Sequence, residues 1–174
     1  MNNNNNNKKD YRFDHRTKEE FAADIAKFTA IEKELMIDYV NWLNSKLKDK
    51  TQKYIYYDNG IDNSGKYLES DEVDSRPDFI LLTPSGKSRL IEIKFSRNEH
   101  DKFHIKLTHV KRCIAEDICL VMWMATETPN KRFCILTPEK LRILAQDLDR
   151  IVKFKPWGYK ECLRITDKDV DWNK

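Results

Sequence analysis

The chain has 174 residues, of which 40% are hydrophobic and 35% charged, and its formal net charge is +3. This balance is typical of a soluble protein with one core, and it does not by itself indicate nucleic-acid binding, which depends on local charge patches. No apolar run approaches the roughly 20 residues that a membrane helix needs, and no export signal is evident, so we expect a cytoplasmic protein with no membrane partner.

The chain begins with a run of asparagines followed by basic residues. An asparagine run cannot form a core, so residues 1–16 are predicted to be a flexible tail. Its lysines and arginines are either a solvated leader or an arm that contacts phosphate. Residues 17–174 are predicted to form a single domain.

A long helix is predicted from Thr17, with acidic residues in its first turn, where the helix dipole favours them. Its apolar residues recur at helical spacing and form one stripe: Phe21, Ile25, Phe28, Leu35, Tyr39 and Trp42. Glu32 lies in the middle of this stripe, whereas Glu34 falls on nearly the opposite face. A carboxylate on a buried stripe is costly unless it is paired, so Glu32 is a candidate functional residue.

The rest of the chain alternates between strand and helix patterns. The predicted elements are strands at 53–57, 79–83 and 88–95, a basic helix at 103–116, strands at 119–125 and 132–136, a helix from 138 to about 150, and a last strand at 160–165. The connection from Asp58 to Arg76 is long and acidic, and such loops are usually functional or mobile.

The strands around Gly86 are predicted to form a hairpin. A three-residue loop that ends in glycine is a common hairpin connection, because its last position needs a left-handed backbone. If Thr83 pairs with Lys87, the register places Asp78 opposite Glu92, with Cβ atoms about 4.5–5.5 Å apart.

Two carboxylates at this distance repel each other, and both would lie in otherwise apolar strands. Such a pair needs a cation or a shared proton. Lys94 follows Glu92 by two residues and therefore points from the same face of the strand. Two carboxylates beside an ammonium group favour a hard cation such as Mg²⁺.

Pro77-Asp78 followed by Glu92-Ile93-Lys94 resembles the motif of the PD-(D/E)xK nuclease superfamily. Within it, the layout is most similar to archaeal-type Holliday junction resolvases, in which the preceding helix carries a glutamate in a pattern like that around Glu32. The resemblance spans residues from about 17 to about 125. The acidic connection before Pro77 is longer than a resolvase's, which leaves junction specificity in doubt.

This resemblance implies an α/β fold with a restriction-endonuclease-like αβββαβ core, in which a mixed sheet is flanked by helices. It implies catalytic roles for Asp78, Glu92, Lys94 and Glu32. Asp78, Glu92, Glu32 and the Ile93 carbonyl would bind Mg²⁺, for which Mn²⁺ could substitute. The implied activity is hydrolysis of DNA phosphodiester bonds, either structure-specific or restriction- or homing-like.

Basic residues flank the motif and are candidate contacts to the DNA backbone. They are Lys87 and Arg89 on the hairpin, and Lys102, Lys106, His109, Lys111 and Arg112 after the motif. The alternative is a solvated helix face. Since one domain of this size carries one active site and cutting two strands needs two, we expect a homodimer.

Other functions remain open at this point. The same metal site would serve an RNA endonuclease, and the same fold would serve a module that binds DNA without cutting it. A non-enzymatic interaction domain is a third alternative, although no feature of the sequence favours it.

The four cysteines include no Cys-x-x-Cys pair: Cys113, Cys119, Cys134 and Cys162. We expect reduced, mostly buried thiols. A zinc site built from His104, His109 and the first two of these cysteines is a minor alternative, because zinc motifs usually show tighter paired spacing.

Overall fold

The computed structural model describes residues 17–60 and 76–173. The predicted tail and most of the connection before Pro77 lie outside the described residues, as does the side chain of Phe21. Within the described ranges, no helix is long and apolar enough to cross a membrane.

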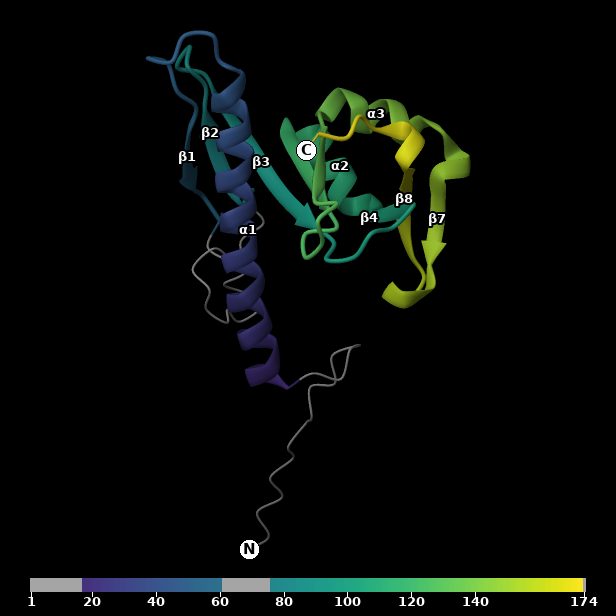
Figure 1. The fold of residues 1–174 in the computed structure, drawn as a ribbon. Helices are drawn as coiled ribbons and strands as arrows, with labels where there is room; N and C mark the ends of the chain where they lie inside the picture. The colour runs from purple at the N-terminus through teal and green to yellow at the C-terminus, as the bar shows by residue number, and fades with distance from the viewer. Residues whose placement is uncertain (1–16, 61–75, 174) are drawn as a thin grey trace, which may run out of the picture.

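Helices and strands alternate along the chain in an order close to the predicted one (Figure 1). The elements are α1 (Lys18–Lys46), β1 (Ile55–Asp58), β2 (Phe79–Leu82), β3 (Ser88–Phe95), β4 (Lys102–Lys106), α2 (Leu107–Ala115), β5 (Ile118–Met124), β6 (Arg132–Leu136), α3 (Pro138–Gln146), β7 (Ile151–Phe154) and β8 (Lys160–Thr166). Short 3₁₀ helices occupy Leu148–Arg150, Lys155–Trp157 and Asp167–Asp169.

The larger sheet is mixed and has the strand order β1-β2-β3-β5-β6. β3 and β5 run parallel, and the other neighbours are antiparallel. One core cluster packs α1 onto one face, and a second packs α2 and α3 onto the other. The expected mixed sheet flanked by helices is confirmed, and the order α1-β1-β2-β3-α2-β5 matches the expected αβββαβ core, with β4 inserted before α2.

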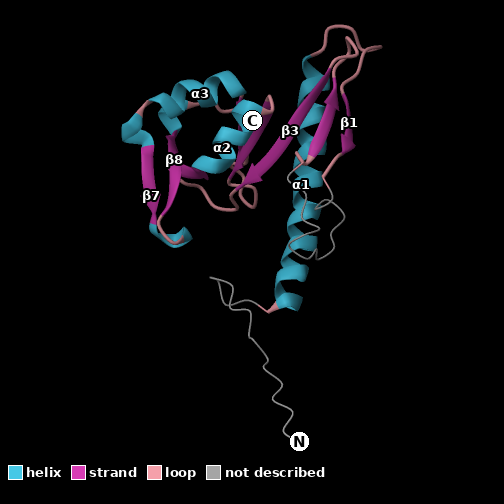
Figure 2. Cartoon of the chain, turned by 180° about the vertical axis from the view of Figure 1, so that it is seen from behind, coloured by secondary structure: helices cyan, strands magenta, loops and turns pink. Residues whose placement is uncertain are grey.

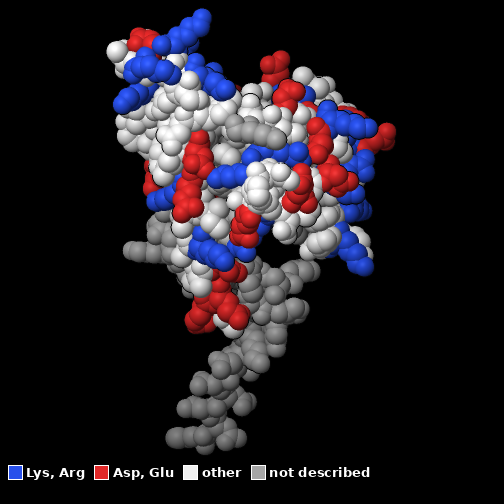
Figure 3. All heavy atoms as spheres, in the orientation of Figure 1, with Lys and Arg blue, Asp and Glu red and all other residues white. Residues whose placement is uncertain are grey.

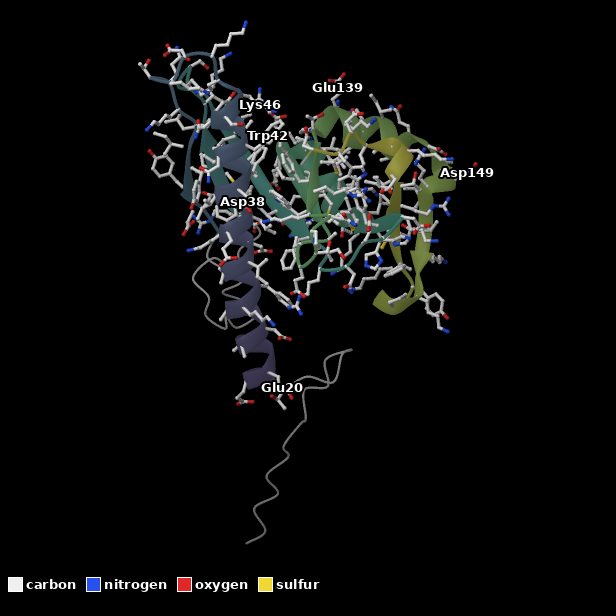
Figure 4. The ribbon with its side chains drawn as sticks, viewed as in Figure 1. Glu20, Asp38, Trp42, Lys46, Glu139 and Asp149 are labelled. Carbon is white, nitrogen blue, oxygen red and sulfur yellow. The ribbon has the colours of Figure 1, made fainter. Side chains whose placement is uncertain are left out.

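Helix α1 begins where the sequence predicts. The Thr17 side chain accepts a hydrogen bond from the Glu20 N–H, and the Glu20 carboxylate accepts one from the Thr17 N–H. This reciprocal capping fixes the start of the helix. The C-terminal half packs on the sheet, where Trp42 contacts Phe133, whereas Glu20 lies at the end that extends beyond the strands (Figures 1 and 4).

The turn between β2 and β3 has the predicted geometry. The Thr83 N–H donates to the Lys87 carbonyl at 2.8 Å, and Gly86 has a φ of +80°. This left-handed backbone is costly for residues with a Cβ atom. The glycine therefore selects the turn, and the turn sets the register of the hairpin.

A second sheet, with the order β4-β8-β7, was not predicted. Figures 1 and 2 show β7 and β8 on the side of α2 and α3 that is remote from α1. The predicted last strand is confirmed as β8, but it belongs to this sheet and pairs with β4.

The predicted helix at 103–116 is wrong in its first part, which forms β4. Phe103 and Ile105 are buried, whereas the residues on either side are more exposed, so burial alternates as it does in a strand. The helix starts only at Leu107. The helix that starts at Pro138 also ends early, at Gln146, where Asp147 begins a short 3₁₀ turn.

All four cysteines are free and buried, as expected. Cys113 belongs to the core on the α2 side of the sheet, whereas Cys119 belongs to the core on the α1 side. No three His, Cys, Asp or Glu side chains in the described ranges lie close enough together to hold one metal ion. The zinc alternative is therefore not supported.

Candidate active site

The hairpin register places the two motif carboxylates at the same level of the sheet. Phe79 pairs with Ile91 in the outermost step of the ladder, and Asp78 and Glu92 are the next residues outward on the two chains. Asp78 lies just before β2, and its Oδ2 accepts a hydrogen bond from the Ile93 N–H at 2.9 Å. The Asp78 side chain thus binds the β3 backbone directly after Glu92.

Glu92 is 5% exposed and is held by two cationic side chains. Its Oε1 accepts a hydrogen bond from Lys94 Nζ at 2.7 Å, and its Oε2 accepts one from an Arg112 guanidinium nitrogen at 2.7 Å. The predicted convergence of Glu92 and Lys94 on one face is confirmed. Because even-numbered residues of β3 face α2, the same face meets Arg112.

The protonation of Asp78 reflects its surroundings. Burial raises the pKa of the Asp78 carboxyl to about 6, and the negative charge of Glu92 adds to this effect, while Lys94 opposes it. The Asp78 carboxylate is therefore costly to keep charged. A cation beside it would reduce that cost.

Glu92 and Lys94 are both charged at neutral pH. Burial would raise the pKa of Glu92, but Lys94 and Arg112 hold it below its usual value. Partial burial disfavours the ammonium of Lys94, but the carboxylates of Glu92 and Asp78 raise its pKa above the usual value. The site therefore contains a permanent positive charge next to the acidic pair.

His109 faces the same carboxylate from α2. Its Nε2 lies 3.5 Å from Glu92 Oε1, and within the described residues this buried nitrogen makes no hydrogen bond. Burial lowers the pKa of His109 to about 4; the negative charge of Glu92 opposes this shift, and Lys94 and Arg112 add to it. His109 is therefore a neutral imidazole with an uncommitted ring nitrogen beside the acidic pair.

Glu32 and Glu34 differ as the helical stripe predicts, since Glu32 is half-buried and Glu34 is exposed. The negative charge of Glu32 also contributes to the raised pKa of Lys94. Glu32 is thus close to the site, although it does not form a three-carboxylate cluster with Asp78 and Glu92.

The predicted DNA-contacting residues separate into two groups. Lys87 and Arg89 are exposed near the hairpin turn, at the opposite end of β3 from the site. Lys87 and Lys94 are seven residues apart, or roughly 23 Å along a strand, so they would contact different parts of a DNA molecule. In Figure 3, basic and acidic side chains are interspersed over the visible face rather than forming one basic patch.

The second group lies on β4 and on α2, the helix that brings His109 and Arg112 to Glu92. Lys102, Lys106 and Lys111 are exposed, whereas the Arg112 side chain is 20% exposed and bound to Glu92. Sequence reasoning missed this contact. His109 and Arg112 are three residues apart and share a face of α2, which would have suggested it once α2 was placed over β3.

No family model matches the sequence, and no curated protein matches it. Among solved structures, the fold is similar to a Holliday junction resolvase from the archaeal hyperthermophile Archaeoglobus fulgidus. The two chains share 10% identity, the match covers 81% of this chain and 89% of that one, and the TM-score is 0.45. A likeness at this TM-score carries no information about function.

Proposed function

We propose that the chain is a divalent-metal-dependent DNA endonuclease of the PD-(D/E)xK type, which hydrolyses phosphodiester bonds. The observation that supports this proposal most directly is the grouping of Asp78, Glu92 and Lys94. Asp78 is fixed to the β3 backbone at Ile93, and Lys94 contacts the buried Glu92 carboxylate at 2.7 Å. Two acids and one cation thus meet around β3, where Glu92 is buried and the Lys94 side chain is 40% exposed.

The donor set fits Mg²⁺ or Mn²⁺. Carboxylate oxygens are hard ligands, and Mg²⁺ is commonly bound by one or two carboxylates together with water and substrate phosphate. Asp78 and Glu92 would hold the ion, with the Ile93 carbonyl and, through water, Glu32 as further ligands. Such an ion would supply Lewis acidity at the scissile phosphate and lower the pKa of the attacking water.

The protein groups have separate roles in this proposal. Lys94 stabilises the negative charge that develops on the phosphate, and its side chain is 40% exposed, so a substrate can reach the ammonium group. His109, which is neutral at physiological pH, can accept a hydrogen bond from water or substrate without adding charge. Arg112 keeps Glu92 ionised in the absence of metal.

One observation favours a second candidate, a nuclease-fold module that binds DNA without cutting it. Both oxygens of Glu92 are bound to cations, Lys94 and Arg112. A chain in which Arg112 permanently replaces the metal would retain the fold and lose catalysis.

Cleavage assays separate these candidates. Labelled duplex, branched and single-stranded DNA, and RNA, are incubated with the protein, with and without Mg²⁺ or Mn²⁺. We expect metal-dependent cleavage of DNA that Asp78→Asn abolishes, and RNA cleavage would shift the assignment to an RNA endonuclease. Binding without cleavage under all conditions would select the non-cleaving module. Sedimentation of the same protein tests the proposed homodimer.

A further inference from the structure

A cavity of about 730 Å³ opens directly beside the candidate active site. Its lining includes Lys94 and His109, together with the end of β3, the loop that follows, strand β4 and Phe154 of β7. The volume falls within the range of about 300–1,000 Å³ that is typical of ligand pockets. A molecule in this cavity would therefore lie next to the groups that act on the scissile phosphate.

Two aromatic rings stack in the wall of the cavity. The rings of His104 and Phe154 have centroids 4.3 Å apart and an interplanar angle of 23°. They come from β4 and β7, which both pair with β8, so the second sheet brings them together. Burial lowers the pKa of His104, and Lys102 and Arg164 add to this effect, so the wall is neutral and aromatic.

The charges around this wall have one prevailing sign. Among the described residues that line the cavity, Lys94, Lys102 and Lys106 are cationic and Asp101 is anionic. A cationic rim beside an aromatic wall suits a ligand that combines a flat ring with negative charge. Single-stranded nucleic acid has these two properties, because its bases stack on aromatic side chains while lysines contact its phosphates.

We propose that this cavity binds an unpaired base of the DNA strand being cut, so that the enzyme prefers DNA with an unpaired nucleotide at the scissile phosphate. This inference rests on the proposed nuclease function. A base within a continuous duplex would first have to be unpaired and unstacked, at an energetic cost that an already unpaired base avoids. Single-stranded or locally unpaired DNA is therefore cut faster than continuous duplex.

The base contact is tested by a double-mutant cycle in the absence of metal, where no cleavage occurs. Binding of a thymidine oligonucleotide is compared with that of an abasic oligonucleotide of equal length, for wild type and for Phe154→Ala. We expect Phe154→Ala to weaken binding of the thymidine oligonucleotide by about 5- to 150-fold and to leave abasic binding unchanged. A loss that is equal for the two oligonucleotides, or no loss, overturns the proposal.

Three further variants distinguish loss of a base contact from a structural effect of the Phe154 substitution. Phe154→Tyr retains the ring and should bind like wild type, whereas His104→Ala tests the same wall from β4 and should behave like Phe154→Ala. Ile143→Ala removes an exposed apolar side chain from α3 and should leave binding unchanged. Full base-dependent binding by either alanine variant at the wall excludes the base pocket.

Cleavage with Mg²⁺ then separates this inference from the function on which it rests. Absence of cleavage on every substrate overturns the proposed nuclease and the substrate preference with it, while the binding cycle alone decides whether a base occupies the cavity. Cleavage of continuous duplex as fast as unpaired DNA overturns the preference and leaves the nuclease intact.

Discussion

Arg112 should compete with the metal for Glu92. Its guanidinium donates to Glu92 Oε2 at 2.7 Å, and both side chains are largely shielded, with relative exposures of 20% and 6%. A metal ion that binds Glu92 must either displace the Arg112 guanidinium or bind despite the electrostatic repulsion between the two cations. We therefore predict that Arg112→Ala increases the affinity for Mg²⁺ and Mn²⁺.

The magnitude follows from the contact that is lost. A hydrogen bond to a charged group contributes about 1.5–3 kcal/mol. If metal binding no longer has to break this bond, the affinity for metal should rise by roughly 10- to 150-fold. Without metal, the variant should lose stability by about the same 1.5–3 kcal/mol. Lys94 still binds Glu92, so that carboxylate keeps one partner.

The assay is calorimetric titration of Mn²⁺ into wild type and Arg112→Ala, together with unfolding with and without the metal. The metal should stabilise the variant more than it stabilises wild type, because ligand binding stabilises the native state in proportion to the logarithm of its affinity. Arg142→Ala removes an exposed arginine from α3 and serves as the matched control. Equal or weaker metal binding by Arg112→Ala would refute the competition.

Three further predictions concern the neighbouring acids and lysines. The pKa of Asp78 is raised from 3.8 to about 6, so the metal-free protein should lose up to about 3 kcal/mol of stability as the pH rises from 4 to 7. The stability of Asp78→Asn should not fall over this pH range. Identical pH profiles for the two proteins would contradict the prediction. Glu32→Gln should lower Mg²⁺-dependent cleavage by about 10- to 100-fold, whereas Glu34→Gln should have no effect; equal effects would mean that Glu32 lies outside the site. Neutralising Lys106 or Lys111 should reduce the steepness of the slope of log DNA-binding affinity against log salt concentration by about one. The reduction should be equal on two unrelated DNA sequences. An unchanged slope with an altered sequence preference would point to base recognition.

The features that were predictable from the sequence are those set by local chemistry. The hairpin register follows from the turn at Gly86, whose left-handed backbone is confirmed, and it placed Asp78 and Glu92 at the same level. The start of α1 follows from the Thr17 cap. In each case, residues close in sequence determine the geometry.

The features that were missed depend on distant contacts or on weak boundaries. No Gly or Pro separates β4 from α2 at Lys106, so the sequence pattern predicts one continuous helix where the structure has a strand and a helix. β7 has four residues, none of them fully buried, and this strand is held in the sheet by its pairing with β8. The contact of Arg112 with Glu92 joins residues 20 positions apart and requires α2 to be placed first.

The extension of α1 beyond the sheet also determines how firmly Glu32 is held. Leu35, Met36, Tyr39 and Val40 anchor the turns after Glu32 in the core. Before Glu32, Phe28 packs edge-on against Phe95 at the end of β3, and Ile25, a turn earlier, is half-buried. Amide protons of the projecting turns should exchange at low opening free energies, and those after Glu32 should exchange only through more global opening. The Glu32 carboxylate thus lies one turn from the projecting segment, and fraying that extended past Phe28 would move it without unfolding the sheet.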